Sequence, residues 1–374
     1  MRAWPVYVRC AHVGQYLPMS DLPLGRSDRV ANDARLPAPG ADAEELAARF
    51  MRDLWGYMIT QALGVIADLG VADAIDDASA VTIDDLAVAV GAERGALYRA
   101  MRALASMGYF TELAPRMFGH TPLSQLLRED TPGSLRQIAR WNASEPFRAW
   151  SEFGDTVRSG SPAFDRMFGA PLFDYLSEHD ERRDTFNRGM AGLAAARLEV
   201  LLAQDWSDVR RLVDVGGGRG ALVAAMLARN PEMHGVVFDL PAVADEATRH
   251  LSECDVDGRW EVQGGDFFAE VPAGADLYVL SQILHDWSDD RCLTIVRTCR
   301  AAIPQHGRLV LLELVVPPGD QPSPAKLLDL QMLVMATGRE RTEAEWSALL
   351  AAGGFTLRRV LTRVRSSMIE AVPA

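Results

Sequence analysis

One run near the middle of the chain reads Leu212-Val213-Asp214-Val215-Gly216-Gly217-Gly218-Arg219-Gly220. Its apolar half predicts a buried strand, and its glycines predict a tight turn that leads into a helix at Ala221. Glycine lets a backbone approach a ligand closely, and a helix N-terminus favours an anionic group. Gly216, Gly218 and Ala221 also satisfy the GxGxxA spacing of a dinucleotide fold, so this run alone leaves the cofactor open.

Beyond this run, short apolar segments alternate with helical patterns. The predicted strands are 211–215, 236–238, 260–262, 277–280, 309–314 and 368–372, and helices are expected to begin at Ala221, Ala242, Asp289 and Thr342. Buried strands separated by helices are typical of a doubly wound parallel sheet, which predicts an α/β, Rossmann-like domain. Ligands of such sheets bind at the carboxyl ends of the strands.

Acidic residues lie at the ends of three successive predicted strands: Asp214, Asp239 and Asp266. Asp239 is close to the spacing expected of a ribose-binding acid. Asp266 is followed by Phe267, so an acid could accept from an adenine amino group beside a stacking ring. Three acids suit a cationic sulfonium nucleoside better than a pyrophosphate, and we therefore predict S-adenosylmethionine rather than NAD as the cofactor.

The fourth predicted strand leads into His285 and Asp286 at the cofactor edge of the sheet. Imidazole is the side chain whose ordinary pKa suits proton abstraction near neutrality. Because a hydroxyl is a poor nucleophile until it loses its proton, we predict that His285 is a general base for methyl transfer to oxygen. Glu313 and Glu340 are expected to hold its ring in one tautomer. This chemistry requires no metal.

The N-terminal half has a largely helical pattern. Apolar residues recur at helical spacing from Leu46 to Ile66, which predicts one long amphipathic helix whose aromatic-rich face packs on a second subunit or within its own domain. A helix, a tight turn and a second helix follow over 82–107, and two short strands over 109–118 complete a winged-helix pattern. Residues 134–205 are expected to be aromatic-rich helices, some of them lining an apolar pocket.

Winged helices often bind DNA, so DNA binding is an alternative function for this module. The predicted second helix offers only Arg94, Arg99 and Arg102, and the chain has a formal net charge of −13. This charge disfavours polyanionic partners such as nucleic acid or an acidic membrane surface. We therefore interpret the winged helix as a structural and dimerising module and expect a small-molecule ligand.

Length and composition predict a two-domain cytoplasmic protein. The 374 residues are 48% hydrophobic, enough for two cores, and no apolar stretch approaches the roughly 20 residues of a membrane span. The four cysteines lack CxxC spacing, which argues against a disulfide framework or a zinc site. We predict a flexible extension over 1–40, a helical, winged-helix dimerisation and substrate-lid domain over 41–190, and the Rossmann-like domain over 191–374.

Several motifs together resemble one family, the plant-type and bacterial natural-product O-methyltransferases. They are the run 212–220, Phe238-Asp239-Leu240-Pro241, Gly265-Asp266-Phe267-Phe268, His285-Asp286-Trp287-Ser288-Asp289 and Gly338-Arg339-Glu340-Arg341-Thr342. The resemblance runs from about residue 41 to the C-terminus. It implies a homodimer with a winged-helix dimerisation domain, and an S-adenosylmethionine-dependent enzyme that methylates a hydroxyl of a small aromatic molecule.

The resemblance also implies residue roles. Gly216, Gly218 and neighbouring Asp214 would contact the methionine part of the cofactor. Asp239 would contact the ribose hydroxyls, and Asp266 with Phe267 the adenine. Leu240 is also expected to bind the cofactor. His285 resembles the family's base and Glu313 and Glu340 its flanking carboxylates. The residues expected on the substrate side are Asn142, Met190 and Asp286.

Two departures from the plant pattern leave alternatives open. Ser281 stands where plant members usually have Lys, so this cofactor contact should be a hydroxyl, as is common in the bacterial branch. The segment 335–338 is shorter than its plant counterpart, which leaves the acceptor pocket undefined. The alternatives are N- or C-methylation, hydroxylation with the cofactor merely bound, an NAD-dependent dehydrogenase, and a metabolite-sensing DNA-binding regulator.

Overall fold

The computed structural model describes residues 43–76, 79–256, 258–363 and 366–374, and the predicted extension 1–40 lies outside them. The described residues form two compact units. One unit contains 43–152 and 173–193, and the other contains 153–172 and 194–374. The predicted boundary between functional domains at residue 190 stays a prediction.

The first unit begins with two helices, α2 (Ala43–Leu54) and α3 (Gly56–Asp68), where the periodicity predicted one. The chain breaks at Trp55, whose φ of −85° and ψ of 1° lie outside the helical range. Gly56, a poor helix former, follows at the break. The expectation of one uninterrupted helix was therefore wrong, although the helical segments themselves were predicted.

The winged helix follows and agrees with its predicted pattern. Its elements are β1 (Val81–Thr82), α4 (Ile83–Ala89), α5 (Arg94–Ser106), β2 (Phe110–Ala114) and β3 (Met117–His120), in the antiparallel sheet order β1-β3-β2. The Thr82 side chain accepts a hydrogen bond from the Asp85 amide and so caps α4. Buried Met101, Phe110 and Phe118 belong to the core of this unit.

Short helices connect the winged helix to the large sheet. They are α6 (Pro122–Gln125), α7 (Arg136–Asn142), α8 (Glu145–Ala149), the 3-10 turn η1 (Trp150–Glu152), α9 (Phe153–Ser159), α10 (Ala163–Phe168), α11 (Leu172–Glu178) and the long α12 (Asp180–Leu202). The prediction of helices over 134–205 is confirmed. Helix α7 packs on α3 within the first unit.

The second unit is built on a seven-stranded sheet in the order β6-β5-β4-β7-β8-β10-β9. Five strands are parallel: β4 (Arg211–Val215), β5 (His234–Asp239), β6 (Trp260–Gly264), β7 (Leu277–Ser281) and β8 (Arg308–Glu313). Strand β4 pairs with both β5 and β7, so the strand order reverses there. A ligand of a doubly wound sheet binds at such a reversal, beyond the carboxyl ends of the strands.

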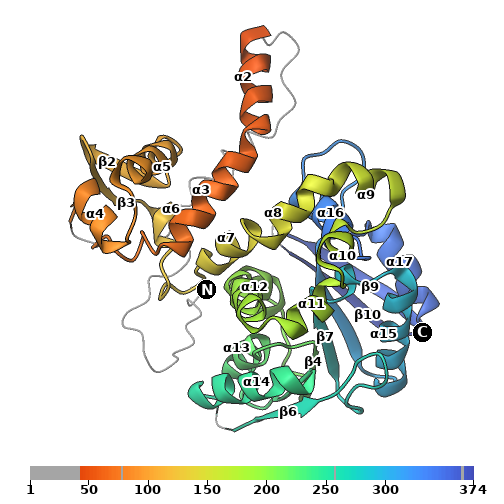
Figure 1. Cartoon of the computed structure of the whole chain (residues 1–374). Coiled ribbons are helices and arrows are strands. Elements are labelled where there is room, and N and C mark those ends of the chain that lie inside the picture. The colour runs from red at the N-terminus through yellow and green to blue at the C-terminus, as the bar shows by residue number, and fades with distance from the viewer. Residues whose placement is uncertain (1–42, 77–78, 257, 364–365) are drawn as a thin grey trace. The chain divides into compact units, whose positions relative to one another are not determined.

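Helices cover both faces of this sheet (Figure 1). These helices are α13 (Ala221–Arg229), α14 (Pro241–Glu253), α15 (Asp289–Ala302) and α17 (Glu343–Ala352), whereas α16 (Pro324–Met335) packs on α9 and α10. One apolar core joins α13, α14 and the end of α12 to the sheet, and a second core joins α15 and α17 to the opposite face. This two-faced burial explains why most residues of strands such as β7 are apolar.

One edge of the sheet departs from the predicted parallel pattern. Strand β10 (Ser367–Pro373) runs antiparallel to β8, and β9 (Phe355–Thr362), which no sequence pattern predicted, runs antiparallel to β10. Strand β9 lies at the edge and is half exposed, so it lacks the apolar run that identified the central strands. The Rossmann-like fold class is confirmed, with this antiparallel pair as a correction.

Candidate active site

The glycine run forms the turn between β4 and α13 at the carboxyl edge of the sheet. Gly216, Gly218 and Gly220 have φ values of +72°, +55° and +79°, which only glycine adopts without strain. A Cβ on Gly216 would lie 2.4 Å from Ile283 Cδ1, whereas a Cβ on Gly218 would meet nothing within 4 Å. Gly216 is therefore required for packing, and Gly218 leaves space beside the turn.

The amides of this turn are largely engaged by the protein itself. Gly216 and Gly217 donate to Phe238 O at 2.8 and 3.3 Å, and Gly218 donates to Asp239 Oδ2 at 2.8 Å. A pyrophosphate would need these amides and would meet the Asp239 carboxylate. The arrangement therefore disfavours a dinucleotide, whereas the open side of Gly218 next to an acid fits a cationic nucleoside.

Asp239 ends β5, and each of its carboxylate oxygens accepts one backbone amide. Oδ2 receives Gly218 N, and Oδ1 receives Leu240 N at 2.7 Å. Burial raises the pKa of Asp239, and these two bonds oppose the rise. Because a carboxylate oxygen accepts more than one hydrogen bond, Asp239 retains acceptor capacity for ribose hydroxyls.

Asp214 lies inside β4 and is buried. Burial, followed by the charge of Asp239, raises the pKa of Asp214 to about 8. Its Oδ1 has no hydrogen-bond partner among the described residues. Asp214 therefore supports the floor of the glycine turn, where a Cβ on Gly217 would lie 2.8 Å from its Oδ2.

The end of β6 brings together an acid and aromatic rings. The exposed Asp266 accepts a hydrogen bond from Phe268 N at 2.9 Å, which fixes the turn that carries Phe267. The Phe267 ring lies 4.9 Å from the Phe268 ring and 6.3 Å from the Trp287 ring, in edge-to-face arrangements. The Phe267 Cε1 atom would lie 3.8 Å from a Cβ on Gly216, so this aromatic group borders the glycine turn.

Glu313, at the end of β8, anchors the loop that follows β7. Its Oε1 accepts from the Ile283 and Leu284 amides at 3.1 and 3.0 Å, and its Oε2 accepts from Gln282 Nε2 at 2.9 Å. Gln282 has a φ of +55°, which is strained for a residue with a side chain. The half-buried Ser281 ends β7 just before this loop.

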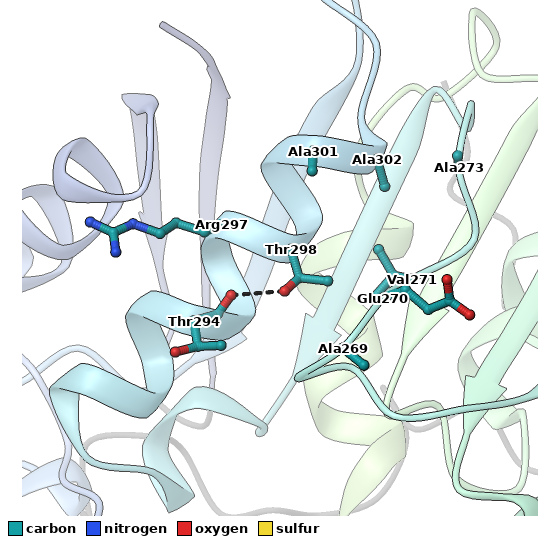
Figure 2. Close-up of a pocket in the computed structure, with 9 residues that line it drawn as sticks. All are labelled: Ala269, Glu270, Val271, Ala273, Thr294, Arg297, Thr298, Ala301 and Ala302. Atoms are coloured by element: carbon teal, nitrogen blue, oxygen red, sulfur yellow. Dashed lines mark hydrogen bonds between the residues drawn. The ribbon is translucent and has the colours of Figure 1, made fainter.

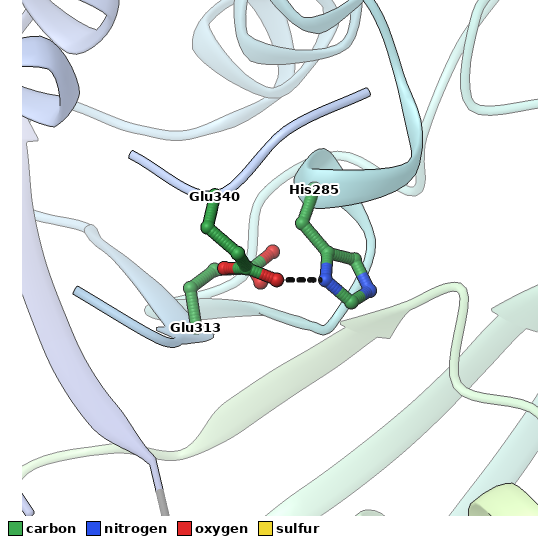
Figure 3. A group of neighbouring side chains, drawn as sticks. All are labelled: His285, Glu313 and Glu340. Carbon is green, nitrogen blue, oxygen red and sulfur yellow. Dashed lines mark hydrogen bonds and ion pairs between the residues drawn. The ribbon is translucent and has the colours of Figure 1, made fainter. Parts of the chain in front are cut away.

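His285 lies in the 3-10 turn η2 (Leu284–Asp286), and Figure 3 shows its ring directed toward Glu340. Its Nδ1 lies 2.7 Å from Glu340 Oε1, and its Nε2 lies 3.5 Å from Asp286 Oδ1. A carboxylate at Nδ1 leaves Nε2 as the atom able to exchange a proton. Of the two flanking glutamates, Glu340 contacts the ring, whereas the hydrogen bonds of Glu313 go to the loop. The predicted role of both glutamates in holding one tautomer stays a prediction.

The charges around His285 change its protonation. Burial lowers the pKa of His285, but the negative charges of Asp286 and Glu313 and the bond to Glu340 outweigh it and raise the pKa to about 10. Burial raises the pKa of Asp286 to about 6, against the opposing charges of His285 and Arg197. The site is thus a compact acidic cluster around one imidazolium.

The same three side chains resemble a metal-binding set. Donor atoms of His285, Glu313 and Glu340 lie within 4.8 Å of one another. Hydrogen bonds within the protein already occupy donor atoms of this set. Glu340 Oε1 pairs with His285 Nδ1, and Glu313 Oε1 accepts from the Ile283 amide of the loop. The expectation that the chemistry needs no metal stays a prediction.

Two predicted substrate residues lie in the other compact unit. Asn142 ends α7, where its amide donates to Ile138 O at 2.9 Å, and the half-buried Met190 lies in α12. Trp141 and Phe186 beside them are in edge-to-face contact, with ring centroids 5.3 Å apart. The third predicted substrate residue, Asp286, lies beside His285. The roles of Asn142, Met190 and Asp286 toward a substrate stay predictions.

A separate hollow lies along α15 and the segment after β6, and Figure 2 shows it. Its lining is mostly Ala, Val and Thr, with Glu270 and Arg297 as its charged residues. None of the predicted site residues lines it. We therefore place the candidate active site at the acidic cluster rather than at this hollow.

Sequence reasoning missed residues that hold the His285 turn. Arg341 is buried and contacts the backbone on both sides of His285, and Gly338 packs against the same turn. Both residues belong to the motif Gly338-Arg339-Glu340-Arg341-Thr342, which was quoted above only as part of the family resemblance. The position of the charged Arg341 directly after the predicted Glu340 was the one sequence feature that could have indicated this role.

Known proteins match both halves of the chain. Residues 150–356 match the model of the O-methyltransferase domain, and residues 51–130 match the O-methyltransferase dimerisation domain. The phenazine O-methyltransferase PhzM of Lysobacter antibioticus is 43% identical over 335 residues, which cover 89% of this chain and 98% of that protein. The chain belongs to the O-methyltransferase family.

Other members of the family differ in the atom they methylate. O-demethylpuromycin-O-methyltransferase of Streptomyces alboniger is 39% identical to this chain, and the match covers 89% of this chain and 92% of that protein. Phenazine-1-carboxylate N-methyltransferase of Pseudomonas aeruginosa is 32% identical, and the match covers 84% of this chain and 93% of that protein. Family membership therefore leaves oxygen and nitrogen acceptors open.

Solved structures support the fold and the cofactor. The crystal structure of LaPhzM has a TM-score of 0.84 with 43% identity, and covers 88% of this O-methyltransferase family member and 99% of that chain. NcsB1, an O-methyltransferase from neocarzinostatin biosynthesis, was solved in complex with S-adenosylmethionine and 2-hydroxy-5-methyl naphthoic acid. Its TM-score is 0.72 at 31% identity, and the match covers 84% of this chain and 96% of that chain. The predicted cofactor, S-adenosylmethionine, is confirmed for the family. No described helix is long and apolar enough to cross a membrane.

Proposed function

We propose that this chain transfers the methyl group of S-adenosylmethionine to a hydroxyl of a small aromatic natural product, with His285 as the general base. The observation that carries the proposal is the buried His285–Glu340 pair at the carboxyl edge of the sheet, where Nδ1 lies 2.7 Å from Oε1. Relatives that act on phenazine and puromycin compounds support an aromatic acceptor.

The residues beside the glycine turn fit the cofactor. Gly218 offers open space, Asp239 offers carboxylate oxygens for ribose hydroxyls, and Asp266 with Phe267 offers an acceptor and a ring for adenine. When bound, S-adenosylmethionine supplies an electrophilic methyl group and a positive charge. The acids at two neighbouring strand ends, Asp239 and Asp266, favour such a cation over an anionic nucleotide. The buried Asp214 adds no charge near neutrality, because burial raises its pKa to about 8.

His285 is poised to accept a proton once positive charge enters the cluster. In the free protein three carboxylates surround the imidazole, and its raised pKa keeps it protonated near neutrality. A nearby cation lowers the pKa of a histidine, because it disfavours the charged ring. The neutral Nε2 then accepts the proton of the acceptor hydroxyl, and Glu340 stabilises the imidazolium that forms.

A second candidate is methylation of nitrogen. The N-methyltransferase relative supports it, and a neutral amine already carries a lone pair and needs no base. His285 therefore separates the candidates, because only a hydroxyl acceptor requires its proton to be removed before attack.

We also infer that a second copy of the chain covers the apolar face of α2 and α3. Large apolar side chains are exposed there: Leu46, Phe50, Leu54, Trp55, Tyr57, Met58 and Val65. A contiguous exposed apolar surface is unusual for a monomer. The matched dimerisation domain begins within this surface, at residue 51.

Calorimetric titration tests the cofactor. We expect wild type to bind S-adenosylmethionine and S-adenosylhomocysteine but not NAD, and Asp239→Ala to lose both sulfur nucleosides while remaining folded. Asp245→Ala, an exposed acid on neighbouring α14, is the matched control and should bind normally. Absence of binding to folded wild type would refute the methyltransferase proposal.

An acceptor screen tests the base. Phenolic and amine compounds are incubated with the protein and the cofactor, and products are identified by mass spectrometry. We expect methylated phenols from wild type and a loss of roughly 10²- to 10⁴-fold in His285→Ala. Full activity of His285→Ala on an amine would favour N-methylation. A salt-dependent DNA gel shift would instead revive the regulator hypothesis.

A further inference from the structure

The turn that carries His285 is held by a charged side chain that has no place in the mechanism above. Arg341 is 1% exposed, which is rare for arginine and requires hydrogen-bond partners for its guanidinium. It lies just after Glu340 and its backbone carbonyl accepts a hydrogen bond from Val316 N at 3.0 Å. This hydrogen bond ties the backbone of Arg341 to the segment that follows β8, the strand that ends at Glu313.

The guanidinium of Arg341 bonds the backbone on both sides of the base. Its Nη1 donates to Leu284 O at 3.2 Å, and its Nη2 donates to Trp287 O at 3.2 Å. These carbonyls flank His285 and Asp286 in the sequence. A planar fork that engages both carbonyls fixes the ends of the turn, and hence the direction of the imidazole between them.

Other residues hold the guanidinium itself in place. Asp289 Oδ1 accepts from Arg341 Nε at 3.0 Å and from Nη2 at 2.7 Å. The Arg341 Cζ atom lies 5.0 Å from the ring centroid of Trp346, a cation–π contact. The Cys292 thiol donates to Leu284 O at 2.9 Å, which adds a second donor at one of the two carbonyls.

The segment before Arg341 contacts the same turn from close range. A Cβ on Gly338 would lie 1.9 Å from His285 O and 2.5 Å from Trp287 N. The backbone of the two segments therefore meets without side chains between them. Glu340, between Gly338 and Arg341, is thereby brought to the His285 ring.

We propose that Arg341 is a positioning residue for the base, which fixes the Leu284–Trp287 turn so that His285 Nδ1 faces Glu340 and Nε2 faces the acceptor. Its catalytic consequence rests on the proposed function, but the placement of the ring does not. A lysine at this position keeps the charge but offers a single point of donation, so it cannot span both carbonyls with the same geometry.

Proton NMR of the full chain tests the placement without any substrate. The His285 Nδ1–H should give a downfield signal because of its short bond to Glu340, and its absence in His285→Gln assigns it. We expect the signal to move upfield or broaden in Arg341→Lys. Arg300→Lys is the matched control, because Arg300 also donates to a backbone carbonyl, Gly354 O, and lies over an aromatic ring, Phe355, away from the site.

Kinetics provides the second readout. We expect Arg341→Lys to lower kcat by roughly 10- to 100-fold, to displace the rising limb of the pH profile and to leave the KM for S-adenosylmethionine nearly unchanged. Arg300→Lys should behave as wild type. If the NMR signal shifts as expected but wild type methylates no hydroxyl acceptor, the positioning role stands and the proposed function fails.

An unchanged His285 signal and unchanged kcat in folded Arg341→Lys would overturn the proposal. If Arg341→Lys does not fold, Asp289→Asn tests the same contact, because it weakens the carboxylate that orients Nε and Nη2. Asp289 is largely exposed, so its replacement leaves the core intact. A shifted signal in Asp289→Asn supports the proposal, and an unchanged one overturns it.

Discussion

His285 and Glu340 are 55 residues apart in sequence, yet Nδ1 of the histidine lies 2.7 Å from Oε1 of the glutamate. The loop after β7 supplies the ring and the segment after α16 supplies the carboxylate. Because both side chains are buried, the carboxylate of Glu340 helps to keep the imidazole protonated by raising the pKa of His285.

Removing the charge of Glu340 should change the pH dependence of methylation. Glu340→Gln keeps an oxygen acceptor for Nδ1 but removes a negative charge that raises the pKa of His285. A base is active when deprotonated, so kcat/KM rises with pH, and a lower pKa moves this rise to lower pH. We expect the shift together with a loss of roughly 10- to 100-fold in kcat. Glu343→Gln, on the exposed start of α17, should leave the profile in place.

Asp214→Asn should alter the pH dependence of stability. Wild-type Asp214 has a folded pKa of about 8, against an ordinary value of 3.8. Between these values the folded state holds a proton that the unfolded state has lost, so wild-type stability falls as pH rises. Asparagine does not titrate, so the variant lacks this fall in stability. The Tm of Asp214→Asn minus the Tm of wild type should therefore increase by at least roughly 2 °C between pH 5 and pH 8.5. A constant difference, as expected for Asp245→Asn, would contradict this.

Filling the open side of the glycine turn should weaken cofactor binding. Gly218→Ala and Gly274→Ala both place a Cβ at positive φ with nothing within 4 Å, and each should cost about 1–2 kcal/mol of strain. Of the two glycines, only Gly218 lies in the proposed cofactor site. We expect calorimetry to show a Kd for S-adenosylhomocysteine at least tenfold higher in Gly218→Ala, and unchanged in Gly274→Ala. Equal affinities in both variants would place the nucleoside elsewhere.

Charging the apolar face of α2 should dissociate the dimer. Phe50 is 67% exposed, and Phe50→Glu would bury a carboxylate in the inferred interface. Light scattering should show the wild-type dimer and a largely monomeric Phe50→Glu at micromolar concentration. Val157→Glu is the control, because Val157 on α9 is 62% exposed but lies outside this face. The inference fails if both variants keep the wild-type mass.

Local pattern was sufficient for much of the second unit. The apolar run before the glycines predicted β4 with its observed bounds, and the Thr342 cap predicted the start of α17. Periodicity failed at Trp55, where one residue interrupts a helical pattern, and at β9, whose half-exposed residues alternate too weakly. The break at Trp55 precedes Gly56, a poor helix former, and interrupts an otherwise periodic pattern. Strand β9 depends on its pairing with β10, a neighbour in space that local periodicity does not reveal.

The sequence was enough to establish the Rossmann-like class, the acids at the strand ends and His285 as the candidate base, because each follows from short-range pattern and side-chain chemistry. Tertiary structure alone showed that Glu340 contacts the imidazole while Glu313 accepts hydrogen bonds from its loop, and that Arg341 spans the turn. Burial and long-range contact decide which of several carboxylates meets a given ring, and the linear order of residues leaves that choice open.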